Sequence, residues 1–145
     1  MQEGLAALTR TVAVSFAFNA DARNVRQARQ ALRGALLRSG AEELIDDAVL
    51  VLSEIVTCAF MYAGTEVRVH LWSTEAAVRV EVEDGAAHIP TSRQSQTAGT
   101  SQSLHLLDSL VDRWGVVARG FGKAVWFEIG EFDIDLDGGP PAAKR

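Results

Sequence analysis

The spacing of apolar residues changes period several times between residues 11 and 129, and this order constrains the fold more than any other feature of the sequence. Alternating apolar residues predict a half-buried strand at 11–18. Residues 21–40 repeat apolar side chains at steps of three and four, which predicts a helix capped by Asp21 and ended at Ser39-Gly40. A second helix is expected over 41–63, with acidic first turns and a wide apolar stripe that places it at the centre of the core.

The second half of the chain returns to the strand period. Two alternating runs, 66–73 and 77–83, predict an antiparallel hairpin with one buried face. A long loop without periodicity follows at 84–102, then a helix at 103–113 and a second hairpin from 114 to 129. The order β-α-α-β-β-loop-α-β-β predicts an α+β fold, a two-layer sandwich with helices packed on one face of a mixed, mainly antiparallel sheet.

The chain of 145 residues fits one domain over 8–130, followed by an acidic, Pro- and Gly-containing flexible tail at 131–145. Cys58 is the single cysteine, which excludes an intrachain disulfide and a cysteine zinc cluster. The three histidines have no metal-site spacing, so no metal is predicted. No signal peptide is recognisable and no apolar run approaches the roughly 20 residues of a membrane span, so we expect a cytoplasmic protein.

Charge is unevenly distributed along the chain. The formal net charge of −5 argues against direct nucleic-acid binding, which requires a basic footprint. Between Ala22 and Ser39 every charge is positive, whereas most of the charged residues after Phe127 are acidic. The basic helix is interpreted either as a surface for an acidic partner or as a solvated helix face, and it could instead meet the acidic tail within one chain or across a dimer. The candidate partner-binding residues are Arg23, Arg26, Arg29 and Arg33.

Three separated segments of the sequence resemble a known family. They read DDAVLVLSEIVTCA at 46–59, VRVEVEDGAAHIP at 78–90 and LHLLDSLVDRWGVVARGFGKAVWFEI at 104–129. In this order they resemble the histidine-kinase-like ATPase superfamily, and within it the small anti-sigma factor serine kinases of bacteria. The resemblance covers nearly the whole chain. It implies a Bergerat-type ATPase fold, with ATP or ADP and Mg²⁺ as cofactors if the nucleotide site has survived.

The resemblance assigns roles to three positions near the expected nucleotide site. Glu54 matches the acid that activates the attacking hydroxyl or orients water in kinase members. Asp84 matches the aspartate that accepts a hydrogen bond from the adenine amino group. Cys58 stands where the family has a magnesium-holding Asn, and a thiol is a poor substitute for an oxygen ligand. Without the resemblance, Glu54 is interpreted as an acidic residue on a helix surface, Asp84 as a turn residue and Cys58 as a small apolar residue of the core.

The glycine positions of the family's nucleotide loops are also changed. Ala86 and His88 occupy the two glycines of an Asp-x-Gly-x-Gly pattern, where side chains crowd an adenine or restrict the backbone. Ser101 and Ser103 replace the glycines that bring bare backbone amides to the phosphates at the start of the third helix. Both serines would still serve as helix caps.

Two classes of function remain open. The first is a regulatory protein-binding module resembling an anti-sigma factor, with impaired or absent ATP binding, no cofactor and no enzyme activity. The resemblance implies a sigma factor or an anti-sigma factor antagonist as its partner, and a possible homodimer. The alternative is an active ATP-dependent protein serine/threonine kinase in which Glu54 is the catalytic residue. The departures at the nucleotide positions favour the binding module.

Overall fold

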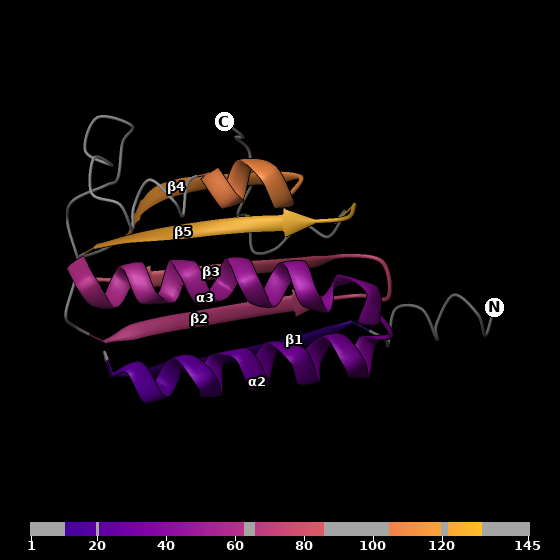
Figure 1. Cartoon of the computed structure of the whole chain (residues 1–145), viewed down its shortest axis with the longest axis horizontal. Helices are drawn as coiled ribbons and strands as arrows, with labels where there is room; N and C mark the ends of the chain where they lie inside the picture. Colours follow the sequence, from indigo (N-terminus) through magenta and orange to yellow (C-terminus); the bar gives the residue numbers. More distant parts are fainter. Residues whose placement is uncertain (1–10, 20, 63–65, 86–104, 120–121, 132–145) are drawn as a thin grey trace.

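The computed structural model describes residues 11–19, 21–62, 66–85, 105–119 and 122–131 (Figure 1). A five-stranded sheet in the order β1-β2-β3-β5-β4 is covered on one side by the helices α2 and α3. The predicted α+β two-layer sandwich is therefore confirmed. In chain order the elements are β1 (Val12–Phe18), α2 (Ala22–Ser39), the 3-10 helix η1 (Glu42–Leu44), α3 (Ile45–Tyr62), β2 (Val67–Ser73), β3 (Val78–Asp84), a helical segment at 105–110, β4 (Arg113–Arg119) and β5 (Gly122–Ile129).

The sheet is antiparallel throughout the described strands, so the prediction of a mixed sheet is corrected in that respect. β1 pairs with β2, β2 with β3, β3 with β5 and β5 with β4, each in antiparallel register. β3 and β4 do run in the same direction, because both are antiparallel to β5. The segment through 105–110 connects β3 to β4 in the chain. The two strands are nevertheless not neighbours, because β5 lies between them in the sheet.

Local signals place α2 as the sequence predicts. The Asp21 carboxylate accepts from the backbone N–H of Arg23 at 2.9 Å and from the Arg23 guanidinium at 3.0 Å. The side-chain hydrogen bond, followed by the backbone one, holds the pKa of Asp21 below its ordinary value. At the other end Gly40 adopts φ 85°, a left-handed conformation that favours glycine, and its N–H donates to helix carbonyls.

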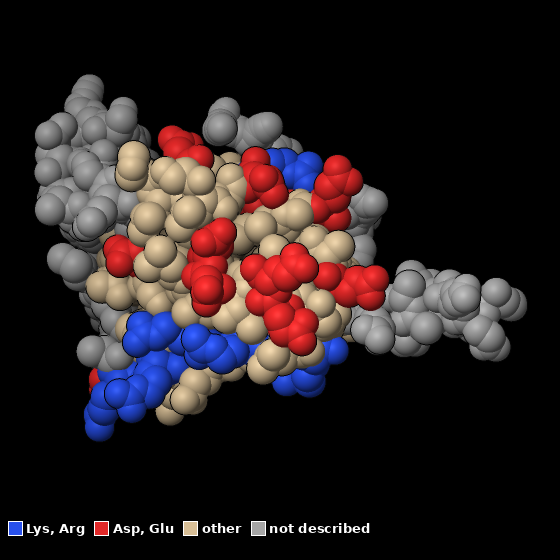
Figure 2. All heavy atoms as spheres, turned by 45° about the vertical axis from the view of Figure 1, so that its right-hand side comes forward, with Lys and Arg blue, Asp and Glu red and all other residues tan. Residues whose placement is uncertain are grey.

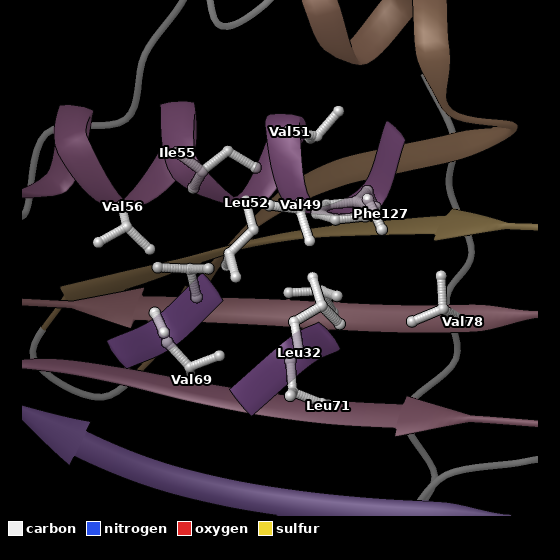
Figure 3. Close-up of a cluster of buried hydrophobic side chains, with 14 of the residues drawn as sticks. Leu32, Val49, Val51, Leu52, Ile55, Val56, Val69, Leu71, Val78 and Phe127 are labelled. Atoms are coloured by element: carbon white, nitrogen blue, oxygen red, sulfur yellow. The ribbon is translucent and has the colours of Figure 1, made fainter. Parts of the chain in front are cut away.

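The core lies between the helix pair and the sheet. Figure 3 shows Leu32 of α2 and Leu52 of α3 directed into the same cluster as Val69, Leu71 and Phe127 of the strands. All five side chains are fully buried. The predicted apolar stripes of both helices are therefore the core-forming faces, and burial of these side chains is the main contribution to the stability of the fold.

The prediction of one buried face for the hairpin of β2 and β3 is wrong for β3, which is buried at six of its seven positions. On the side of the sheet away from the helices, here called the outer face, Arg79 donates to Glu81 at 2.8 Å and to Glu128 at 2.6 Å. The Arg79 guanidinium also lies 4.4 Å from the ring centroid of Trp126. A strand with one buried face would expose these charged residues, whereas mutual pairing allows them to be buried.

None of the described helices is long and apolar enough to cross a membrane. The expected boundary of the domain at residue 8 and nearly all of the predicted tail at 131–145 lie outside the described residues.

Candidate functional site

Three of the predicted nucleotide-site residues lie on α3 and β3. Glu54 and Cys58 are four residues apart on α3, which places them on the same helix face, and both are half-buried. Asp84 is the last residue of β3. Figure 1 shows the C-terminal end of α3 at the end of the sheet where β3 finishes and β5 starts.

Asp84 is buried and ion-paired at this end of the sheet. The Lys123 ammonium donates to both oxygens of the Asp84 carboxylate, at 2.8 and 3.0 Å. The two side chains are only 3% and 6% exposed, respectively. The residues are directly opposite each other in the register of β3 and β5, on the same side as the core residues Val82 and Val125. Asp84 is therefore more than a turn residue, because its charge is neutralised inside the helix-facing side of the sheet.

Gly122 makes this arrangement possible. A Cβ atom at this position would lie 1.9 Å from the carbonyl oxygen of Asp84, closer than any side chain tolerates. The absence of a side chain lets the start of β5 approach the end of β3, and the next residue, Lys123, then stands against the Asp84 carboxylate. Gly122 thus allows the close approach of the two strands, and Lys123 provides the counter-ion of Asp84.

Lys123 is the site residue that sequence reasoning missed. It is 39 positions away from Asp84, and the pairing becomes visible only through the register of β3 and β5. A signal was present in the sequence, because a lysine directly before the apolar run at 124–127 requires a counter-ion if that strand is central.

Four predicted positions, Ala86, His88, Ser101 and Ser103, lie outside the described residues, so their roles stay predictions. Among the residues that the structure describes, no three His, Cys, Asp or Glu side chains are grouped so as to hold a metal ion.

The candidate partner-binding arginines differ in their surroundings. Arg26 and Arg33 are exposed on α2, and Arg23 is exposed but paired with Asp21. Arg29 is half-buried and donates to the Ser53 hydroxyl of α3 at 3.2 Å, a contact that joins the two helices. Arg38, which was not among the predicted partner residues, is exposed near the end of α2. Figure 2 shows Lys and Arg side chains gathered in a patch beside a patch of Asp and Glu.

Comparison with known families agrees with this fold. The sequence profile of the histidine kinase-like ATPase domain matches residues 18–129, from the end of β1 to the end of β5, and so includes Glu54, Cys58, Asp84 and Lys123. The chain therefore belongs to the histidine kinase-like ATPase family. A search of curated proteins found no match.

Proposed function

We propose that this chain is a regulatory protein-binding module, similar to an anti-sigma factor, in which the ATPase fold is kept and ATP binding is impaired. The ion pair between Asp84 and Lys123 is the observation that carries this proposal. By resemblance, Asp84 is the acceptor for the adenine amino group. In this chain both of its oxygens already accept hydrogen bonds from the lysine, so an adenine amino group must either share the carboxylate with the ammonium or displace the ammonium.

The displacement is expensive because the pair is buried. Separating a buried ion pair costs about 3–5 kcal/mol when the freed charge gains no new partner. Each 1.4 kcal/mol corresponds to about tenfold in affinity, so displacing the ammonium would lower nucleotide affinity by roughly two to three and a half orders of magnitude. The ion pair of Asp84 thus disfavours binding of an adenine nucleotide at this position.

The metal end of the site also fits a magnesium nucleotide poorly. Mg²⁺ prefers oxygen ligands in octahedral geometry, and the position of the family's Asn is the half-buried thiol of Cys58. Glu54 retains a carboxylate on the same helix face, one turn earlier. The Glu54 carboxylate alone does not replace the family's magnesium-holding Asn at position 58. These two residues therefore do not support phosphoryl transfer.

The arginines of α2 support binding to an acidic protein surface. Arg26 and Arg33 are exposed, and neither forms an ion pair with any residue in the part of the chain that the structure describes. Arginine is favoured at protein interfaces because its guanidinium forms bidentate contacts with carboxylates. By resemblance, the partner is a sigma factor or an anti-sigma factor antagonist, and the chain acts in transcriptional control.

Thermal unfolding with magnesium nucleotide tests the proposed loss of ATP binding. We expect millimolar Mg-ATP or Mg-ADP to leave the Tm within about 1 °C of the value with magnesium alone. A ligand with a Kd near 10 µM would, at about 1 mM, add about 2.7 kcal/mol to the stability of the folded state. That gain would raise the Tm by several degrees for a domain of this size, and such a rise would overturn the proposal.

The alternative function is an ATP-dependent protein serine/threonine kinase, and the observation in its favour is that Glu54 lies on α3 one turn before Cys58, on the same face of the helix. A rise in the Tm with Mg-ATP would favour this kinase function. Transfer of radiolabelled phosphate to a purified antagonist domain, lost in Glu54→Gln, would then establish the kinase.

Charge reversal on α2 tests the partner surface. The double variant Arg26→Glu with Arg33→Glu is expected to weaken binding to the cognate sigma factor or antagonist domain at least tenfold, since it replaces attraction by repulsion at the interface. The control is Arg68→Glu, an exposed position on β2 on the outer face of the sheet. The affinity of both variants for the purified partner domain is measured by biolayer interferometry. Equal affinities would show that α2 does not contact the partner.

A further inference from the structure

The outer face of the sheet is buried along β3 and β5. Five side chains of these strands alternate with core residues and therefore point away from the helices: Arg79, Glu81, Ala124, Trp126 and Glu128. We call these five residues the buried strip, because the exposed fraction of each is at most 7%. From Ala124 to Glu128 the strip is about 14 Å long, at about 3.4 Å per residue.

The other strands leave the same face more open. On β4 the outward side chain of Arg113 is 44% exposed, and Val117 is 38% exposed. On β1 and β2 the outward residues are exposed or half-buried, and they are Ala13, Ser15, Ala17, Arg68, His70 and Trp72. The burial is therefore local to β3 and β5, since a cover over the whole face would bury these residues as well.

None of the described helices lies over the buried strip. α2 and α3 cover the opposite face of the sheet (Figure 1), and Leu107 of the segment at 105–110 belongs to the same core as these helices. The Arg79 guanidinium stacks on the Trp126 ring at 4.4 Å. Stacking leaves one side of this pair open, yet the two residues are only 4% and 2% exposed. The strip therefore requires a cover that the described helices and strands do not supply.

The chain that follows β5 begins beside the buried strip. Gly130 adopts φ 89°, and its N–H donates to the Asp112 carboxylate at 2.7 Å. A Cβ atom at this position would collide with the carbonyl oxygen of Ala76, so the turn requires glycine. Gly130 is two residues beyond Glu128, which places the turn within about 7 Å of the end of the strip.

The sequence directly after this turn has the pattern of a segment with one apolar side. Residues 132–137 alternate apolar and acidic side chains, with Phe132, Ile134 and Leu136 between Asp133, Asp135 and Asp137. In an extended conformation the three apolar side chains are spread over about 14 Å, which equals the length of the strip.

We propose that the buried strip is the docking site of residues 132–136 of the same chain, which run back along the outer face of β5 after the turn at Gly130. Phe132, Ile134 and Leu136 cover the strip, and the aspartates between them face solvent. Burial of three apolar side chains favours the docked state, and the short tether makes the entropic cost of closing the loop small.

The docked segment has a consequence for binding to other proteins. It occupies the outer face of β3 and β5, so a protein partner has to use the helix layer or the edges of the sheet. The proposal does not depend on the proposed function, because it is inferred from the burial of the strip, the turn at Gly130 and the pattern of 132–137.

Hydrogen exchange of the Trp126 indole N–H, followed by NMR in the full chain, tests the docking. The variant Phe132→Ser with Ile134→Ser is expected to raise this exchange rate at least about tenfold, because water then reaches the strip. The Tm is expected to fall by about 5 °C. The Trp114 indole N–H, which donates to Asp108 at 2.9 Å, is the internal reference and is expected to keep its rate.

The variant Asp133→Ser with Asp135→Ser is the matched control, because it changes the solvent-facing side of the same segment. Its Trp126 exchange rate should stay within about twofold of the wild type, and its Tm within about 2 °C. An unchanged Trp126 exchange rate in Phe132→Ser with Ile134→Ser contradicts the proposal, and so does equal acceleration of the Trp126 and Trp114 indoles.

Two further outcomes would assign the cover to another occupant and overturn the proposal. Faster Trp126 exchange in Leu5→Ser with Leu8→Ser, and not in Phe132→Ser with Ile134→Ser, would assign the cover to the N-terminal segment. A wild-type exchange rate that falls between about 50 µM and about 500 µM protein would assign it to a second copy of the chain, because binding of a separate molecule depends on concentration.

Discussion

Replacing Arg79 by alanine is expected to lower the free energy of unfolding by about 3 kcal/mol. Its guanidinium is shared by the buried carboxylates of Glu81 and Glu128, at 2.8 and 2.6 Å, and it covers the ring of Trp126. The variant removes the central cation and leaves two carboxylates close together in a region that water hardly reaches. Desolvated like charges repel strongly, so the loss should exceed that of an ordinary surface ion pair.

Arg113→Ala is the matched control for this prediction. Arg113 contacts the other oxygen of the same Glu128 carboxylate at 2.8 Å, but its side chain is 44% exposed. Its removal should therefore cost less than about 1 kcal/mol. Urea denaturation of both variants, followed by circular dichroism, gives the comparison. Similar losses in the two variants would mean that burial of Arg79 is not what makes this network stabilising.

Lys123→Ala is expected to cost about 3–5 kcal/mol, because it removes the cation that both oxygens of the buried Asp84 carboxylate accept from. Methionine at position 123 would keep most of the volume of the lysine stem while still removing the charge, so Lys123→Met separates packing from charge. If the ion pair is the cause, Lys123→Met should also lose most of the stability that Lys123→Ala loses.

Removing both charges provides the control. The double variant Lys123→Met with Asp84→Leu leaves no unpaired charge, and buried pairs replaced by apolar residues of similar size are often as stable as the original. We therefore expect its free energy of unfolding to be within about 1 kcal/mol of the wild type, measured by the same denaturation. A double variant as unstable as Lys123→Ala would show that Asp84 contributes to the fold by other contacts.

The parts of the fold that the sequence predicts are those set by local signals. α2 begins at the Asp21 cap and ends at Gly40, as expected, because a cap needs only the residues within one turn of it. The core stripe of α3 follows in the same way from its three- and four-residue spacing. Those signals required no knowledge of which strands are neighbours.

The parts that the sequence could not predict depend on contacts between distant residues. Arg79 meets Glu128 across 49 positions and Asp84 meets Lys123 across 39. Both pairs exist because β5 lies next to β3, a choice of neighbour that no local pattern specifies. The alternating pattern of β3 therefore predicts one buried face only, and the resemblance gives Asp84 a role without naming its counter-ion.

For the candidate site, sequence reasoning placed Glu54, Cys58 and Asp84 on the elements where the structure has them. Helical spacing alone does not show that the Arg29 guanidinium donates to the Ser53 hydroxyl of the neighbouring helix. The glycine-replacement positions at 86, 88, 101 and 103 remain predictions from the resemblance.

The proposed loss of ATP binding is tested by calorimetric titration of Mg-ATP into the wild type and into the variant Cys58→Asn with Lys123→Thr. Asparagine restores an oxygen ligand, and threonine can hydrogen-bond Asp84 while leaving it free of the ammonium. The account predicts no saturable heat from the wild type at millimolar nucleotide and saturable one-to-one binding, at least tenfold tighter, by the variant. Saturable binding of Mg-ATP by the wild type with a micromolar Kd would contradict it.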